Sequence, residues 1–200
     1  MNLPLITIVI IIILAAIITY YLARPSTIVN SDRVDVKSTL DNRQYPVQNM
    51  IGKEYAAYLL SLIYQRILIL RDYFENNIDK YPEYRDYIKQ FLNRTGNIML
   101  TENSPDGKYT SYTINKGDMI ALCLRSKDNN QFHDINLIMY VVLHELAHTA
   151  CPEIGHTDLF KTIFTFFLKV AIDLKIYSNV NYQQTPMEYC GITITENLVN

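Results

Sequence analysis

The stretch "VVLHELAHTACPEIGHTDLF", residues 141–160, contains three of the four histidines of this 200-residue chain. Two of them, His144 and His148, are four residues apart, and Glu145 follows the first. Residues four apart lie on the same face of an α-helix, so the two imidazoles point toward one place. The carboxylate of the next residue lies about 100° further round the helix, beside that place. This HExxH spacing is typical of two zinc ligands and a general base.

The residues after this helix supply the candidates for a third ligand. Pro152 ends the predicted helix, because its ring and its missing N–H do not fit a helix interior. Gly155 permits a turn, so His156 can come back toward the first two histidines as the third metal ligand. Three protein ligands leave a fourth position open for water, as catalytic zinc sites require. The alternatives for the third ligand are Cys151, Glu153 and Asp158.

The chemistry predicted from this pattern is hydrolysis with Zn²⁺ as the cofactor. Zinc lowers the pKa of a water toward about 7 and polarises a carbonyl. Glu145 is the expected catalytic base, which takes a proton from that water and returns it to the leaving amine. Tyr182 and Tyr189 are candidates for stabilising the oxyanion. The alternative is that both are packed aromatic residues, two of sixteen tyrosines. His133 is expected in a surface loop.

The chain around the motif predicts an α+β fold. Asp134 is a suitable N-cap for the motif helix, which is apolar on nearly every side and is therefore expected inside the fold. Apolar residues with a 3.6-residue period predict the helices, and short runs between turn signals predict the strands. The expected helices lie at about residues 53–73, 82–96, 134–151 and 157–177, and the expected strands of a small antiparallel sheet at 97–101, 109–114 and 119–124.

The N-terminal segment, residues 1–23, includes twenty consecutive residues without a charge, Leu3–Leu22. A helix of about 20 residues crosses the hydrocarbon core of a membrane, so we predict a single transmembrane helix there. A secretory signal peptide is the alternative, disfavoured by the length of the run and by the lack of Lys or Arg before it. Residues 24–48 are polar and are expected to form a stem or linker, and residues 49–200 the catalytic domain.

Charges and cysteines bear on location and partners. Lys and Arg follow the apolar segment and none precedes it, so the catalytic domain is expected on the cytosolic side of the membrane. The three cysteines, Cys123, Cys151 and Cys190, form no dense framework, which agrees with a reducing compartment. A net charge of −2 gives no reason to expect a nucleic-acid partner.

The residues "LHELAH" and "GHTDLFK" resemble the zincin-type peptidases of the WLM and SprT-like families. The resemblance covers about residues 95–177 and is most specific around 141–161. It implies that His144, His148 and His156 are zinc ligands and that Glu145 is the catalytic base. Gly155 and Phe160 match the segment around the third ligand. The spacing from His148 to His156 differs from that of both families.

The resemblance implies a zincin-like α+β domain, with helices around the small antiparallel sheet. A chain with an apolar N-terminal segment and many Ile, Asn and Tyr residues also resembles the predicted zinc peptidases of large DNA viruses, which extends the expected location to the virion interior. The prediction is a membrane-anchored zinc metallopeptidase that hydrolyses protein or peptide substrates. The alternative is a non-catalytic, zinc-stabilised structural or interaction module of a viral membrane protein. An intramembrane protease is disfavoured, because the apolar run before His144 is too short to span a membrane.

Overall fold

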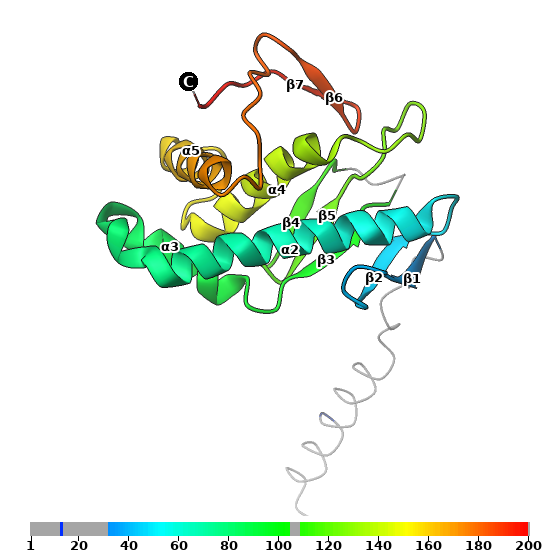
Figure 1. Ribbon diagram of the computed structural model, residues 1–200, viewed down its shortest axis with the longest axis horizontal. Helices are drawn as coiled ribbons and strands as arrows, with labels where there is room; N and C mark the ends of the chain where they lie inside the picture. The colour runs from blue at the N-terminus through cyan, green and yellow to red at the C-terminus, as the bar shows by residue number, and fades with distance from the viewer. Residues whose placement is uncertain (1–12, 14–31, 105–108, 200) are drawn as a thin grey trace, which may run out of the picture. The chain divides into compact units, whose positions relative to one another are not determined.

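The computed structural model describes residue 13, residues 32–104 and residues 109–199 (Figure 1). The chain divides into two compact units, residues 1–33 and 34–200. The second unit contains the helices α2 to α5, a three-stranded sheet and all the candidate site residues. Within the expected stem, residues Arg33–Lys37 and Gln44–Gln48 form two paired strands, β1 and β2. The three-part division of the chain at residues 23 and 48 stays a prediction.

The predicted transmembrane helix and the predicted single-pass membrane location are corrected. In the part of the chain that the structure describes, no helix combines the length and the apolar character needed to cross a membrane. The longest, α2 (Lys53–Asn77), carries charged side chains such as Arg66, and α4 and α5 have only 16 residues each, below the roughly 20 that a span requires. Apart from Ile13, the residues on which the prediction was based lie outside the described part.

The central sheet has the order β3-β5-β4, with β3 at Met99–Glu102, β4 at Tyr112–Ile114 and β5 at Met119–Leu122. β4 pairs with β5 in antiparallel register, but β3 pairs with β5 in parallel register. The expectation of an all-antiparallel sheet was therefore wrong. The turn between β4 and β5 reverses the chain as predicted, whereas the connection after β3 leads to the far side of β5. This topology puts β4 at an edge of the sheet.

Helix α4 (Ile135–Ala150) carries the HExxH motif and contacts α2, α3, α5, β4 and β5, so it lies inside the domain (Figure 1). Its N-cap is Asp134, whose Oδ1 accepts a hydrogen bond from the Asn136 amide at 2.8 Å, as predicted. The helix ends before Cys151, whose backbone is extended and precedes Pro152. The buried position explains why α4 is apolar on nearly every side.

The other helices enclose α4. α2 contacts β2 and β3, and α3 (Arg85–Arg94) and α5 (Asp158–Asp173) pack directly on α4. The expected helices therefore all exist, with ends that differ from the prediction by a few residues. The core between them is rich in aromatic rings, for example Phe74, which contacts Phe91 at 5.8 Å and Phe167 at 5.2 Å between ring centroids.

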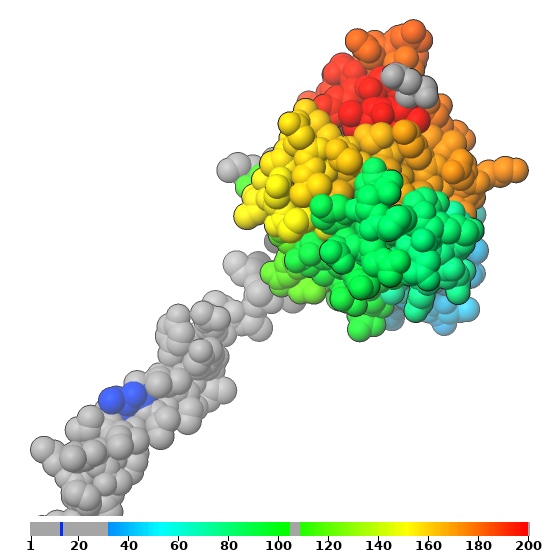
Figure 2. Space-filling model, turned by 90° about the vertical axis from the view of Figure 1, so that its left-hand side faces the viewer, coloured from blue at the N-terminus to red at the C-terminus, as the bar shows by residue number. Residues whose placement is uncertain are grey.

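The C-terminal hairpin consists of β6 (Met187–Tyr189) and β7 (Ile192–Ile194), joined by Cys190 and Gly191. Both joining residues have positive φ, 53° and 85°, which is the backbone of a two-residue hairpin turn. The residues after the hairpin return to the segment that follows α5 (Figure 2), where Asn179 Nδ2 donates a hydrogen bond to the carbonyl of Val199 at 3.2 Å.

A disulfide joins Cys123, at the end of β5, to Cys190 in the turn of the C-terminal hairpin. Cys151 is a buried free cysteine. The chain has no dense disulfide framework, as expected, but two of its three cysteines form a pair. Three cysteines can include one pair, and only the fold determines which two meet.

Candidate metal centre

The three histidines of the opening stretch converge at the C-terminal part of α4. His144 and His148 extend from the same face of the helix, and their Nε2 atoms are 3.2 Å apart. Nε2 of His156 lies 3.0 Å from that of His144 and 3.2 Å from that of His148. The three residues are the one group of potential metal-binding side chains found among the described residues.

The loop from Cys151 to Thr157 brings His156 back to the helix. Gly155 has φ +87°, a left-handed backbone conformation that only glycine adopts without steric cost. Lys116, in the turn between β4 and β5, donates a hydrogen bond to the carbonyl of Pro152 at 3.1 Å. Thr157 then caps α5 by accepting a hydrogen bond from the amide of Phe160. The next helix thus begins directly after the third histidine.

The end of α4 is fixed from the side of α3. The last carbonyls of a helix have no partner within the helix itself. Here the carbonyl of Thr149 accepts a hydrogen bond from Arg94 at 2.8 Å, and that of Ala150 accepts one from Gln90 Nε2 at 2.9 Å. These contacts hold the last turn of α4 in place, one turn after His144 and around His148.

Phe160 supports the three imidazoles from the core side. Its ring stacks on that of His148 with centroids 4.1 Å apart, and it meets His144 at 4.9 Å and His156 at 5.0 Å. Phe160 is itself buried. The ring therefore restricts the orientations of all three histidines, so that their Nε2 atoms keep facing one another.

The donor set fits a divalent metal ion. Zinc–nitrogen bonds of about 2.0–2.1 Å at tetrahedral angles separate neighbouring nitrogens by about 3.3 Å, close to the 3.0–3.2 Å observed. Without a cation, three ring nitrogens that each offer either one proton or one lone pair cannot all pair with one another. Imidazole ligands suit zinc, copper, iron and nickel.

Burial keeps two of the imidazoles neutral. Burial, followed by the neighbouring rings of His148 and His156, lowers the pKa of His144 to about 3. Burial, followed by His156 and Lys116, lowers the pKa of His148 to about 4. Neutral imidazole is the form that binds metal, so near neutral pH these two side chains are ready to act as ligands.

Glu145 lies beside the histidines with its carboxylate almost fully buried. Thr113 of β4 donates a hydrogen bond to its Oε2 atom at 2.6 Å. Burial raises the pKa of Glu145, and the hydrogen bond from Thr113 opposes that rise. The residue lines the same two cavities as His144.

Two cavities open at this site. The first, which we call the histidine cleft, has a volume of about 520 Å³ and is lined by the three histidines, Glu145 and residues 110–113. The second, which we call the hairpin pocket, has a volume of about 240 Å³ and lies between α4 and the C-terminal hairpin. The edge strand β4 borders the cleft.

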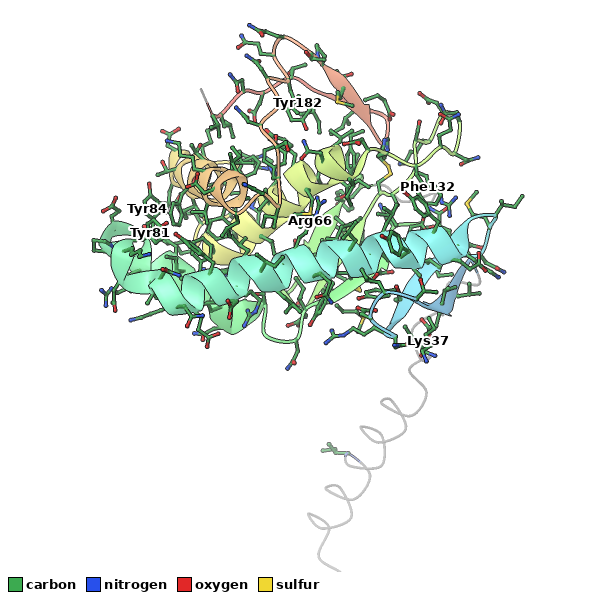
Figure 3. The ribbon with its side chains drawn as sticks, in the orientation of Figure 1. Lys37, Arg66, Tyr81, Tyr84, Phe132 and Tyr182 are labelled. Atoms are coloured by element: carbon green, nitrogen blue, oxygen red, sulfur yellow. A yellow bond between two sulfur atoms is a disulfide. The ribbon has the colours of Figure 1, made fainter. Side chains whose placement is uncertain are left out.

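The two tyrosines considered for the oxyanion lie in different places. Tyr189 lines the hairpin pocket next to His144 and Glu145, and its hydroxyl is 2.7 Å from Ser111 Oγ. Burial raises its pKa, so the hydroxyl keeps its proton. Tyr182, labelled in Figure 3, is fully buried, packs on the ring of Tyr140 at 4.9 Å and lines neither cavity.

The other candidate ligands do not join the histidines. Cys151 is buried at the end of α4, Glu153 accepts a hydrogen bond from Thr157, and Asp158 begins α5. His133 is partly buried rather than in a free surface loop: its Nε2 accepts a hydrogen bond from the Cys190 amide at 3.3 Å. Sequence reasoning missed Thr113 and Ser111, whose only signal was the weak alternation of residues 109–114.

Comparisons with known proteins relate the chain to one domain family and to proteins of two viruses. Residues 98–160 match the WLM domain. The chain is 57% identical over 164 residues to "Uncharacterized protein R325" of Acanthamoeba polyphaga mimivirus, covering 82% of this chain and 83% of the relative. It is 44% identical over 81 residues to "Uncharacterized protein 042R" of Invertebrate iridescent virus 3, covering 40% of this chain and 47% of that protein.

Among solved structures, Wss1 from Saccharomyces cerevisiae aligns with 64% of this chain and 88% of its own, at a TM-score of 0.45 and 20% identity. The match to the mimivirus protein is much stronger, since it extends over most of both chains at more than half identity. This chain therefore belongs to the same protein family as the mimivirus protein R325, and it carries a WLM-like domain of the metallopeptidase type.

Proposed function

We propose that this protein is a zinc-dependent peptidase whose metal ligands are His144, His148 and His156 and whose catalytic base is Glu145. The observation that carries the proposal is the convergence of three Nε2 atoms within 3.2 Å of one another, with the Glu145 carboxylate lining the same cleft. The WLM-like domain at residues 98–160 supports the same conclusion.

The choice of zinc follows from the ligands. Three protein ligands with a free fourth position are typical of catalytic zinc sites, whereas structural sites use four. The group contains no thiolate and no carboxylate among the described residues. A bound Zn²⁺ supplies a Lewis acid that lowers the pKa of water and polarises a carbonyl.

The protein's own residues supply the proton transfers. Oε2 of Glu145 accepts the hydrogen bond from Thr113, which leaves Oε1 to take a proton from the attacking water. The water oxygen adds to the scissile carbonyl carbon, the C–N bond breaks, and Glu145 returns the proton to the leaving amine. Tyr189, which keeps its hydroxyl proton and lies beside Glu145, is the candidate to stabilise the oxyanion; Tyr182 lies in the core.

The substrate class is a protein or peptide in extended conformation. β4 is an edge strand of the sheet and borders the histidine cleft, whereas β5 is paired on both sides. A substrate strand added to β4 would form main-chain hydrogen bonds and pass over Glu145. The strand at Tyr112–Ile114 is therefore the edge that we propose for the substrate.

The test combines metal content with cleavage. We expect purified wild-type protein to bind about one equivalent of zinc and to cleave an unfolded protein such as casein. Glu145→Gln keeps the metal and loses cleavage, and His148→Ala loses both. Cleavage by Glu145→Gln at the wild-type rate would refute the peptidase, and equal zinc in wild type and His148→Ala would refute the metal site. Zinc binding with no Glu145-dependent cleavage would favour the non-catalytic, zinc-stabilised module instead.

A further inference from the structure

The hairpin pocket adjoins the residues proposed for catalysis. It is lined by His144 and Glu145 on one side and by β7 of the C-terminal hairpin on the other. The hairpin lies outside the residues that match the WLM domain, 98–160. This wall of the pocket is therefore a feature of the present chain that the match to the domain does not describe.

The walls of the pocket are mainly apolar. Tyr140 and Val141 of α4 line it one turn before His144 and Glu145. In the hairpin, Tyr189 pairs with Ile192, and Met187 pairs with Ile194. Directly opposed residues of an antiparallel pair point to the same face, so one face of the hairpin is apolar. Ile192 and Ile194 of that face line the pocket.

The hairpin is fixed at three points near its turn. Cys190 forms the disulfide with Cys123, and its amide donates a hydrogen bond to His133 Nε2 at 3.3 Å. The hydroxyl of Tyr189 is 2.7 Å from Ser111 Oγ, and Tyr189 is buried. The wall formed by β7 is thus held against the domain rather than free to move away.

The size and charge of the pocket indicate its occupant. A volume of about 240 Å³ is below the range of about 300–1,000 Å³ usual for whole small-molecule ligands, so it suits one side chain. Glu145 and Glu196 both line the pocket and disfavour an acidic group. Because the pocket lies beside Glu145, a substrate side chain bound in it would lie next to the bond to be cleaved.

We propose that the hairpin pocket binds an apolar side chain of the substrate residue adjacent to the scissile bond, and that Ile194 and Ile192 of the disulfide-held hairpin determine this preference. The inference rests on the proposed peptidase function, because only a peptidase has a scissile bond next to the pocket. The binding of an apolar side chain in the pocket is testable without cleavage.

The first experiment measures cleavage preference. Wild-type protein is incubated with a mixture of peptides of varied sequence, and the cleaved bonds are identified by mass spectrometry. We expect Leu, Ile, Met or Phe to exceed Asp and Glu about tenfold or more at one position next to the cleaved bond. Ile194→Lys should raise cleavage next to Asp or Glu about tenfold, because a positive charge then faces the pocket. Ile69→Lys, at a half-exposed position on α2 that lines neither cavity, is the matched control.

The second experiment needs no catalysis. N-acetyl-leucinamide is titrated into the Glu145→Gln variant, with N-acetyl-aspartamide as comparison, while the methyl resonances of Val141, Ile192 and Ile194 are followed by NMR. The expected result is a saturable shift of these methyl groups with the leucine derivative only. Equal shifts with both compounds, or none at the pocket, would overturn the proposal.

The two experiments separate this inference from the peptidase function. If cleavage depends on Glu145 but has the same preference in wild type and Ile194→Lys, the proposed role of the pocket is refuted and the peptidase function stands. If N-acetyl-leucinamide binds at the hairpin but no peptide is cleaved, the peptidase function is refuted and the binding site for an apolar side chain stands.

Discussion

Thr113 of the edge strand donates a hydrogen bond to Oε2 of Glu145 at 2.6 Å, joining β4 to the motif helix. The strand that would receive the substrate therefore also orients the carboxylate proposed as the base. Since Oε2 is engaged, the other oxygen of Glu145 is the one available to the cleft. In the proposed mechanism, this contact would couple substrate position to proton transfer through one hydroxyl group.

Replacing this hydroxyl tests its role. Thr113→Val keeps the shape of the side chain and removes the donor, so the Glu145 carboxylate can rotate away from its working position. We expect kcat to fall about tenfold to a hundredfold, with KM and zinc content little changed, in steady-state kinetics with a peptide substrate. Thr113→Ser retains the donor and should stay within about threefold of wild type. Equal losses in the two variants would contradict a role for the hydroxyl.

Metal removal should lower the stability of the folded domain. A ligand that binds only the native state stabilises it by about 2.7 kcal/mol when its free concentration is 100 times Kd. We expect a chelator to lower the Tm of wild-type protein by several degrees in a calorimetric scan. The Tm of His148→Ala should not respond to the chelator. A chelator response of equal size in the variant would place the bound metal elsewhere.

The Cys123–Cys190 disulfide should contribute to both stability and hairpin position. It closes a loop with a sequence separation of 67 residues, for which the chain-entropy model gives about 4 kcal/mol as an upper value. We expect the Cys123→Ser/Cys190→Ser double variant to unfold at lower urea concentration and to show faster amide exchange in β6 and β7. A dithiol reductant should reproduce this change in wild type and leave the double variant unaffected. If amide exchange in β6 and β7 is unchanged in the double variant, the other contacts of the hairpin are enough to hold it in place.

A buried ion pair joins the end of β3 to the segment that follows β5. Arg125 Nε donates to Glu102 Oε1 at 2.8 Å, and the two side chains are 5% and 0% exposed. Glu102 also accepts a hydrogen bond from the Gln48 amide, so it links β2 to β3. We expect Arg125→Met to cost about 3–5 kcal/mol of unfolding free energy, because it removes the cation that contacts the buried Glu102 carboxylate.

The exposed pair of Arg85 and Asp79 is the matched control for this variant. Its side chains are 44% and 84% exposed at a separation of 2.9 Å. Arg85→Met should change the unfolding free energy by less than about 1 kcal/mol. If urea denaturation shows similar losses of unfolding free energy in the two variants, burial of the ion pair does not determine the size of the loss.

His133 should give the stability of the domain a pH dependence that is separate from that of the proposed metal ligands. Burial lowers its pKa in the folded state, opposed by Glu188 and by the backbone of Arg125. The folded state therefore binds fewer protons than the unfolded state. The resulting stability is fully present above about pH 6.5, the unfolded value, and is lost as the pH falls toward the lowered folded pKa. His133→Gln should show a shallower fall in unfolding free energy below that pH, measured in chelator, and parallel curves would contradict this account.

Much of the site could be predicted because it depends on one helix. The spacing of His144 and His148 is a local property of the α-helix, and Asp134 and Pro152 mark the two ends of that helix in the sequence and in the structure. The helix positions were predictable for the same reason. The strand order was not, because β3 and β5 pair in parallel across a connection whose path no local signal specifies.

The sequence by itself determined the helices, their ends and the alignment of two imidazoles with a carboxylate beside them, since these follow from backbone geometry over a few residues. Tertiary structure alone decided that Thr113 meets Glu145 across 32 residues, that Tyr189 meets Ser111 across 78, and that Cys123 pairs with Cys190. Such contacts depend on how the whole chain packs around α4. Each is one of many pairings that the residue types permit, and the shared core selects among them.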